Sequence, residues 1–125
     1  MTRNPGAQWR SLLRELERSG ETRIALAGVS AWLARLGASE LPIAVSEAPP
    51  AGLSDYHANY VAAMVEYICA AREVAVPQWT REIAPLARPV FSSELASVRL
   101  HLLAHSPAPF KQRNLFVDST VGDQV

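Results

Sequence analysis

The sequence predicts a mostly α-helical, small single-domain bundle of about four helices, with a proline-rich wrapping segment and a C-terminal arm. Apolar residues recur at helical spacing in four segments, and single glycines and prolines separate those segments. Hydrophobic residues make up 49% of a 125-residue chain, which is enough for one buried core. The expected order is a helical hairpin (1–37), a connector (38–53), a central helix (54–75), a proline-rich wrap (76–91), a further helix (92–105) and the arm (106–125).

The first helix is expected to begin at Asn4 and Pro5 and to run to about Ser19. Asparagine can accept a hydrogen bond from a free N–H at a helix start, and proline is tolerated at the first helical position. Gly20 can then end the helix in the left-handed conformation. One apolar stripe at helical spacing comprises Trp9, Leu12, Leu13 and Leu16.

A second helix is expected from a cap at Thr22 to Gly37. Gly28 inside it costs about 1 kcal/mol relative to alanine, so a close approach by a neighbouring helix is the expected compensation. The residues expected to form its apolar face are Ile24, Ala27, Trp32, Leu33 and Leu36.

Prolines keep residues 38–53 from continuing either neighbouring helix, so an extended connector is expected, with a short strand at 41–45. Ser54 or Asp55 then caps the longest helix, about 56–74, which is expected to be central. The proline-punctuated segment 76–91 is expected to wrap over the core.

Ser92 fits as the cap of a fourth helix, at about 93–105. Its inward residues are expected to be Leu95, Val98, Leu102 and Leu103. A short helical turn at 107–113 and a β-rich stretch at 115–121 complete the chain.

The charge pattern disfavours a dedicated nucleic-acid binder. The chain has 12 Lys+Arg and 12 Asp+Glu, and its net charge is zero, whereas affinity for nucleic acid comes largely from neutralising phosphates. Charge is nonetheless uneven, because residues 1–37 carry six arginines against three glutamates, and residues 38–80 carry five acids against one arginine. No apolar run reaches membrane-spanning length, and the first residues lack the pattern of a signal peptide, so a cytoplasmic location is expected.

No catalytic, cofactor or metal site is expected. His101 and His105 have the spacing that lets two imidazoles reach one metal ion, but zinc needs four ligands and no other residue has supporting spacing. Asp55 and His57 are close in sequence, yet Asp55 is expected to serve as a cap. Cys69 is expected to be a small buried apolar residue. The six glycines are scattered singly and form no phosphate-binding loop, so the protein is not expected to be an enzyme.

The C-terminal segment combines aromatic anchors with basic and amide side chains. One interpretation is an arm that packs back on the core. The other is a recognition element that adds to the edge of a partner's sheet, with Phe110 and Phe116 as anchors and Arg113 pairing with a carboxylate or phosphate. Both can hold at once. The candidate partner-binding residues are Phe110, Lys111, Arg113, Asn114, Phe116 and Asp118.

Three runs in the C-terminal half of the chain resemble segments of known proteins. They are 76–80, 85–91 and 106–118, with the patterns VPxWT, PLxxPxF and SPxPFxxRNxFVD. In them the chain resembles small uncharacterised actinobacterial proteins encoded beside a nucleotidyltransferase-fold protein, an arrangement similar to a toxin and its antitoxin. The resemblance implies a binding role for residues 107–118 and offers no catalytic residues.

These features favour a non-catalytic protein-binding module, an antitoxin-like partner of a neighbouring-gene product. The alternative is a DNA-binding transcriptional regulator that uses the N-terminal helical hairpin, although the second helix offers few side chains that read bases. A protein partner is expected, nucleic acid is less favoured, and no membrane association is expected. The candidate nucleic-acid contacts of the alternative are Arg10, Arg14, Arg18 and Arg23.

Overall fold

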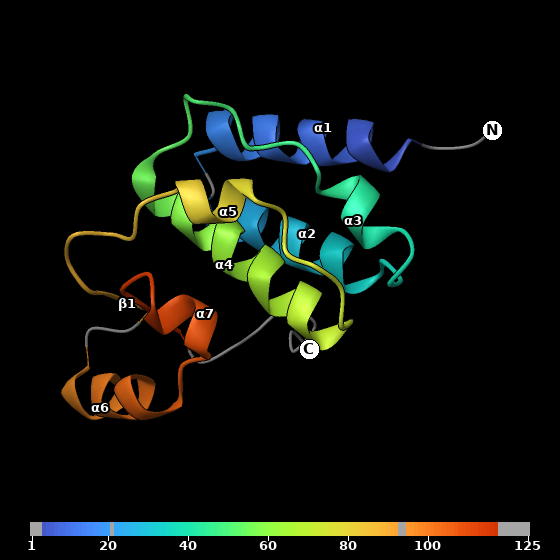
Figure 1. Ribbon diagram of the computed structural model, residues 1–125. Coiled ribbons are helices and arrows are strands. Elements are labelled where there is room, and N and C mark those ends of the chain that lie inside the picture. Colours follow the sequence, from blue (N-terminus) through green and yellow to red (C-terminus); the bar gives the residue numbers. More distant parts are fainter. Residues whose placement is uncertain (1–3, 21, 93–94, 118–125) are drawn as a thin grey trace.

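The structure is a computed structural model that describes residues 4–20, 22–92 and 95–117 (Figure 1). Within these residues the chain is mostly helical, with four helices of ten residues or more and one pair of two-residue strands, so the predicted fold class is confirmed. The elements are α1 (Pro5–Arg18), α2 (Thr22–Ala34), α3 (Leu41–Ala44), α4 (Asp55–Ala71), α5 (Trp79–Glu82), β1 (Val90–Phe91), α6 (Ala96–His105), α7 (Ala108–Lys111) and β2 (Leu115–Phe116).

Helix α1 begins as its sequence predicts. The side-chain oxygen of Asn4 accepts hydrogen bonds from the backbone N–H groups of Gly6 at 2.9 Å and Ala7 at 3.3 Å, which satisfies two donors that have no partner inside the helix. The stripe that α1 buries comprises Trp9, Leu13 and Leu16. The predicted start and length of the first helix are confirmed, but its predicted end is wrong, because Ser19 is the C-cap in an extended conformation and Gly20 has no left-handed φ.

Helix α2 packs against both α1 and α4, and it ends earlier than expected. The guanidinium group of Arg72 donates to the carbonyl oxygens of Ala34 at 2.9 Å and Leu36 at 3.2 Å, so the helix end is satisfied from α4 and not by Gly37. The buried residues of α2 are Leu26, Val29, Ser30 and Leu33. The expected inward positions of Ile24 and Ala27 are wrong, because both side chains are exposed.

The space beside Gly28 is unoccupied, contrary to the expected close approach of a neighbouring helix. A Cβ atom added there meets nothing within 4 Å. Glycine therefore lowers helix stability at this position without a compensating contact. We expect Gly28→Ala to raise the free energy of unfolding by about 0.5–1 kcal/mol in urea denaturation. Ala27→Gly, next to it on the exposed surface, is the matched control and should lower stability by a similar amount; a destabilising Gly28→Ala would contradict the open flank.

The connector contains a short helix, α3, so the strand expected at 41–45 is wrong. Leu41 and Ala44 are buried at helical spacing, and Pro42 fits the first turn of a helix. Helix packing against α1 therefore decides the conformation of this segment in place of strand propensity.

Three tryptophans fix the connector to the core. The ring of Trp9 stacks on that of Trp32, with centroids 5.7 Å apart, and lies 6.3 Å from the ring of Trp79. The indole nitrogen of Trp9 donates to the carbonyl of Glu47 at 2.9 Å, and that of Trp79 donates to the carbonyl of Val45 at 2.8 Å. The cluster satisfies its buried polar atoms and holds α1 and α5 to the connector between them.

Helix α4 is the central helix, as predicted. The Ser54 hydroxyl oxygen accepts from the N–H of His57 at 3.1 Å, so Ser54 is the cap and Asp55 is the first helical residue. Glu73 follows the helix at φ 57°, in the left-handed region that ends helices. The buried residues of α4 are Asn59, Val61, Ala62, Ala63, Met64, Val65, Ile68 and Cys69.

The C-terminal third forms a small unit with parallel strands. Strand β1 lies beside β2, with Val90 opposite Leu115 and Phe91 opposite Phe116, and the chain between them passes through α6 and α7 (Figure 1). The short turn expected at 107–113 is confirmed as α7. Of the expected β-rich stretch, residues 118–121 lie outside the described residues.

Helix α6 differs from its prediction in where it begins and in which of its residues are buried. It begins at Ala96, and Ser93 lies outside the described residues. Leu102 is buried, but the expected burial of Leu95 and Leu103 is wrong, because they are 67% and 46% exposed. In the described part of the chain, no helix has both the length and the apolar character needed to cross a membrane.

Candidate functional site

The arm residues predicted to bind a partner pack largely on the chain's own core. Phe110 is 1% exposed, and its ring meets that of Tyr60 edge to face with centroids 5.5 Å apart. Phe116 is also buried, and its ring stacks on Phe91 at 4.9 Å. Of the two interpretations of the arm, this structure has the one in which the arm packs back on the core, because both rings lie inside the chain. The role of Phe110 and Phe116 as anchors for a partner stays a prediction.

The predicted polar contacts of the arm have internal partners too. The Asn114 side chain donates to the carbonyl of Leu86 at 2.6 Å, and the Lys111 ammonium donates to the carbonyl of Ala104 at 3.2 Å, near the end of α6. Asp118 lies outside the described residues. The arm in this structure therefore joins the wrap to α6.

Arg113 occupies the most polar site in the core. Its guanidinium group donates to both carboxylate oxygens of Glu66, at 3.1 and 3.2 Å, to the side-chain oxygen of Asn59 at 2.9 Å, and to the carbonyls of Ile83 at 2.9 Å and Thr80. All five N–H donors of the side chain are thereby used. The expected pairing of Arg113 with an external carboxylate or phosphate is wrong here, because an internal carboxylate takes that place.

Sequence reasoning missed the partners of Arg113. Glu66 is the single charged residue within the apolar run of α4, and a charge in such a run needs a partner of opposite sign. That signal indicated a buried ion pair. It did not identify which of the chain's arginines forms it.

The basic residues of the DNA-binding alternative lie on the surface of the hairpin. Arg10 pairs with Glu47 at 3.3 Å, and Arg18 approaches Glu15 at 3.9 Å. Arg14 and Arg23 are exposed. The first of these pairs joins α1 to the connector, and two of the four candidate cations form ion pairs within the chain.

The candidate reactive groups do not converge. The rings of His101 and His105 lie 4.4 Å apart on exposed positions of α6, and within the described residues no three His, Cys, Asp or Glu side chains form a metal-binding group. Burial raises the pKa of Cys69 to about 11, with a further contribution from the Glu66 carboxylate, so the thiol stays protonated at neutral pH. Burial lowers the pKa of His57.

One exposed apolar surface stands out, and we call it the α6 face: Ala96, Leu100, Leu103 and Ala104. Leu100 is 70% exposed and is two residues, or about 200° around a helix, from the buried Leu102. It therefore points away from the rest of the chain. The flanking residues of this helix are Arg99 on one side and His101 and His105 on the other, and α6 contains no acidic residue.

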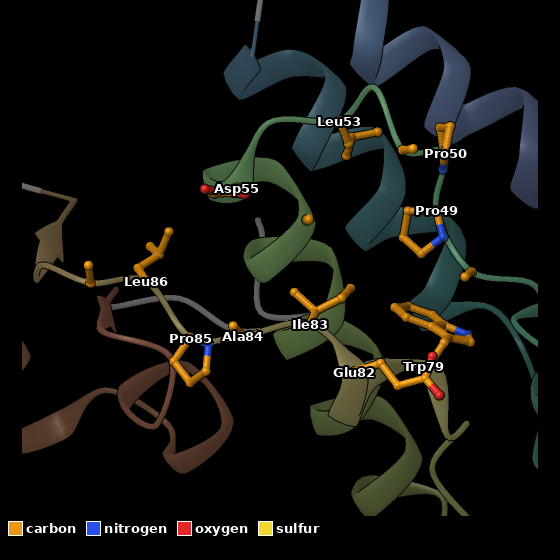
Figure 2. Close-up of a pocket in the computed structure, with 14 residues that line it drawn as sticks. Pro49, Pro50, Leu53, Asp55, Trp79, Glu82, Ile83, Ala84, Pro85 and Leu86 are labelled. Atoms are coloured by element: carbon orange, nitrogen blue, oxygen red, sulfur yellow. The ribbon is translucent and has the colours of Figure 1, made fainter.

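A cleft of about 490 Å³ forms a second surface feature. One wall is residues 48–53 and the other is residues 83–87, with the start of α4 and the residues of α5 between them (Figure 2). Its lining is mainly alanine, proline, leucine and tryptophan. Asp55 and Glu82 are its two charged lining residues, and both are exposed.

Comparisons with family models, with curated protein sequences and with solved structures give no match to this chain. The resemblance to small uncharacterised actinobacterial proteins therefore stays a prediction.

Proposed function

We propose that this protein is a non-catalytic protein-binding module whose contact surface is the α6 face. The observation that supports this most is the exposure of Leu100 and Leu103 on a helix that buries only Leu102. Single exposed leucines are ordinary, but a stripe of them along one helix is typical of a surface that a partner covers. A helix that presents exposed apolar side chains at i and i+3 is a common recognition element.

The basic side chains beside the α6 face indicate the chemistry of the partner. Arg99, His101 and His105 flank the leucines, and Lys111 lies at the C-terminal end of the helix. A second copy of this chain would bring these basic groups against one another. An apolar groove with acidic side chains at its rim complements them, so the partner we propose is a different protein with such a groove.

An antitoxin-like role beside a neighbouring-gene product is the specific form of this proposal. The DNA-binding alternative has weaker support, because Arg10 is paired with Glu47 and Arg18 with Glu15, and because Arg23 is the one basic residue of α2 among the exposed Ile24, Ala27, Gly28 and Ala31. Phosphate binding depends on unengaged cations.

The test is to mix the purified protein with the product of the adjacent reading frame and measure affinity by calorimetry. We expect a one-to-one complex that Leu100→Ser with Leu103→Ser weakens at least about tenfold, because central apolar contacts dominate interface energies. Ile43→Ser is the matched control, since Ile43 is also 70% exposed but lies on α3.

The control variant should bind like the wild type, and all three proteins should show the same thermal unfolding. Raised salt should slow association if the flanking cations steer an acidic partner. The proposal fails if no complex forms, if the α6 variant binds as tightly as the control, or if light scattering shows that the α6 face joins two copies of this chain.

A further inference from the structure

Two exposed histidines lie side by side at the edge of the α6 face. His101 and His105 are about one helical turn apart, and the centroids of their rings are 4.4 Å apart. Among residues 4–20, 22–92 and 95–117, neither imidazole has a hydrogen-bonding or ion-pair partner. Each neutral imidazole therefore keeps a ring nitrogen that can bind a metal ion.

The spacing of the pair suits a single metal ion. Two histidines at i and i+4 on one face of a helix can ligate the same zinc ion. Two nitrogens bound to zinc in tetrahedral geometry, each at about 2.0–2.1 Å, lie about 3.3 Å from each other. Rings whose centroids are 4.4 Å apart can bring two nitrogens to that separation by turning about their side-chain bonds.

The end of α6 that carries the pair is held to the C-terminal unit. The N–H of Ser106 donates to the carbonyl of Leu102 at 3.0 Å, and its hydroxyl lies 2.6 Å from that oxygen and 3.0 Å from the carbonyl oxygen of Val117. The Lys111 ammonium donates to the carbonyl of Ala104 at 3.2 Å. Ligands on a restrained helix lose little conformational freedom when they bind an ion.

The surroundings of the pair select the kind of metal. Helix α6 contains no acidic residue, whereas Ca²⁺ and Mg²⁺ are bound mainly by carboxylate and carbonyl oxygens. Imidazole nitrogen suits zinc and its neighbours among the transition metals. The positive charges of Arg99 and Lys111 lower the affinity for any cation, so binding here depends on the directed bonds from the two nitrogens.

The pair leaves part of a zinc ion's coordination open. Zinc takes four ligands, and within the described residues no third His, Cys, Asp or Glu side chain joins the two histidines. The partner proposed above has acidic side chains at the rim of its groove, and carboxylate oxygens are zinc ligands. We propose that His101 and His105 bind one Zn²⁺ ion whose two remaining positions take water in the free chain and carboxylates of the partner in the complex. The partner's ligands rest on the proposed function, but zinc binding by the free chain does not.

The first experiment uses the free chain. Zinc chloride is titrated into the isotope-labelled full chain while the ring signals of its three histidines are followed by NMR. We expect saturable one-to-one shifts of His101 and His105, no shift of His57, and no response to magnesium chloride. His101→Gln should weaken zinc binding at least about tenfold, because one imidazole alone loses the gain from a second ligand on the same helix.

The third histidine supplies the control for this titration. His57→Gln should bind zinc like the wild type, because His57 lies on α4, outside the pair. An absence of saturable shifts at the pair, or an equal loss of affinity in His57→Gln and His101→Gln, would overturn the site.

The second experiment measures the complex with the product of the adjacent reading frame by calorimetry, with zinc and with a chelator. Zinc should tighten the complex about tenfold, and by linkage the partner should tighten zinc binding by the same factor. His101→Gln with His105→Gln should bind equally in both conditions.

The outcomes of the second experiment separate this inference from the proposed function. A complex of equal affinity with zinc and with the chelator would overturn the metal bridge and leave the proposed function intact. No complex in either condition would overturn both. A zinc-dependent dimer of this chain in light scattering would overturn the assignment of the open positions to a partner's carboxylates.

Discussion

Arg113→Ala is expected to lower the free energy of unfolding by about 3–5 kcal/mol, because it leaves the Glu66 carboxylate without its partner in a largely buried site. The substitution also removes the donors to Asn59 and to two backbone carbonyls. Arg113→Lys should recover only part of this loss, since a single ammonium cannot reproduce the planar fork of five donors. Urea denaturation followed by circular dichroism measures both effects.

An exposed arginine, Arg14, provides the control for this experiment. Arg14→Ala should change the free energy of unfolding by no more than about 0.5 kcal/mol. A double-mutant cycle of Arg113→Ala with Glu66→Ala should give a coupling energy of about 1–3 kcal/mol. Coupling near zero would mean that the ion pair does not hold the arm to α4.

Phe110→Ala is expected to cost about 3–5 kcal/mol of stability, the usual range for deleting a buried aromatic ring. Phe110 is 1% exposed, and its ring lies against Tyr60 of the central helix. The cavity left behind would lie between α4 and α7, two helices in close contact. Thermal and urea unfolding of the purified variant give the value.

Leu100→Ala is the matched comparison within the same C-terminal unit. Leu100 is 70% exposed, so its truncation should change stability by less than about 0.5 kcal/mol. A small effect for Phe110→Ala would contradict the packing of the arm on the core. A large effect for Leu100→Ala would mean that the α6 face is covered within the chain.

Elements defined by local signals were predictable from the sequence. The start of α1 follows from Asn4 and Pro5, and the length of α4 follows from its long apolar face and the cap at Ser54. These signals lie within a few residues of the structure that they determine, so no knowledge of the rest of the chain is needed.

The C-terminal unit could not be predicted at the same level. The leucines of α6 are distributed around the helix, so their spacing does not select one inward face. The two strands are separated by more than twenty residues and pair in parallel, which is a tertiary contact without a local signature. Burial of Arg113 depended on Glu66 and Asn59 of α4, and the identity of such distant partners is set by packing.

The candidate functional surfaces show the same difference between what the sequence reveals and what only the fold determines. The aromatic and basic composition of the arm was visible in the sequence, but it reflected internal packing of Phe110 and Arg113. The α6 face and the cleft arise from which side chains the fold leaves uncovered. That property follows from tertiary structure and not from the order of residues alone.

The parallel strand pair has a consequence for how this protein can change. The N–H of Val90 donates to the carbonyl of Asn114 at 2.8 Å, and the N–H of Ser92 donates to the carbonyl of Phe116 at 3.0 Å, so the chain leaves and rejoins the main body at adjacent points. The segment between β1 and β2 therefore begins and ends at neighbouring points of the fold. Its outward residues, such as those of α6, can be altered while α1, α2 and α4 keep their packing, which lets specificity diverge without a new scaffold. Phe110 and Arg113 lie in the same segment and must stay, because they pack on α4.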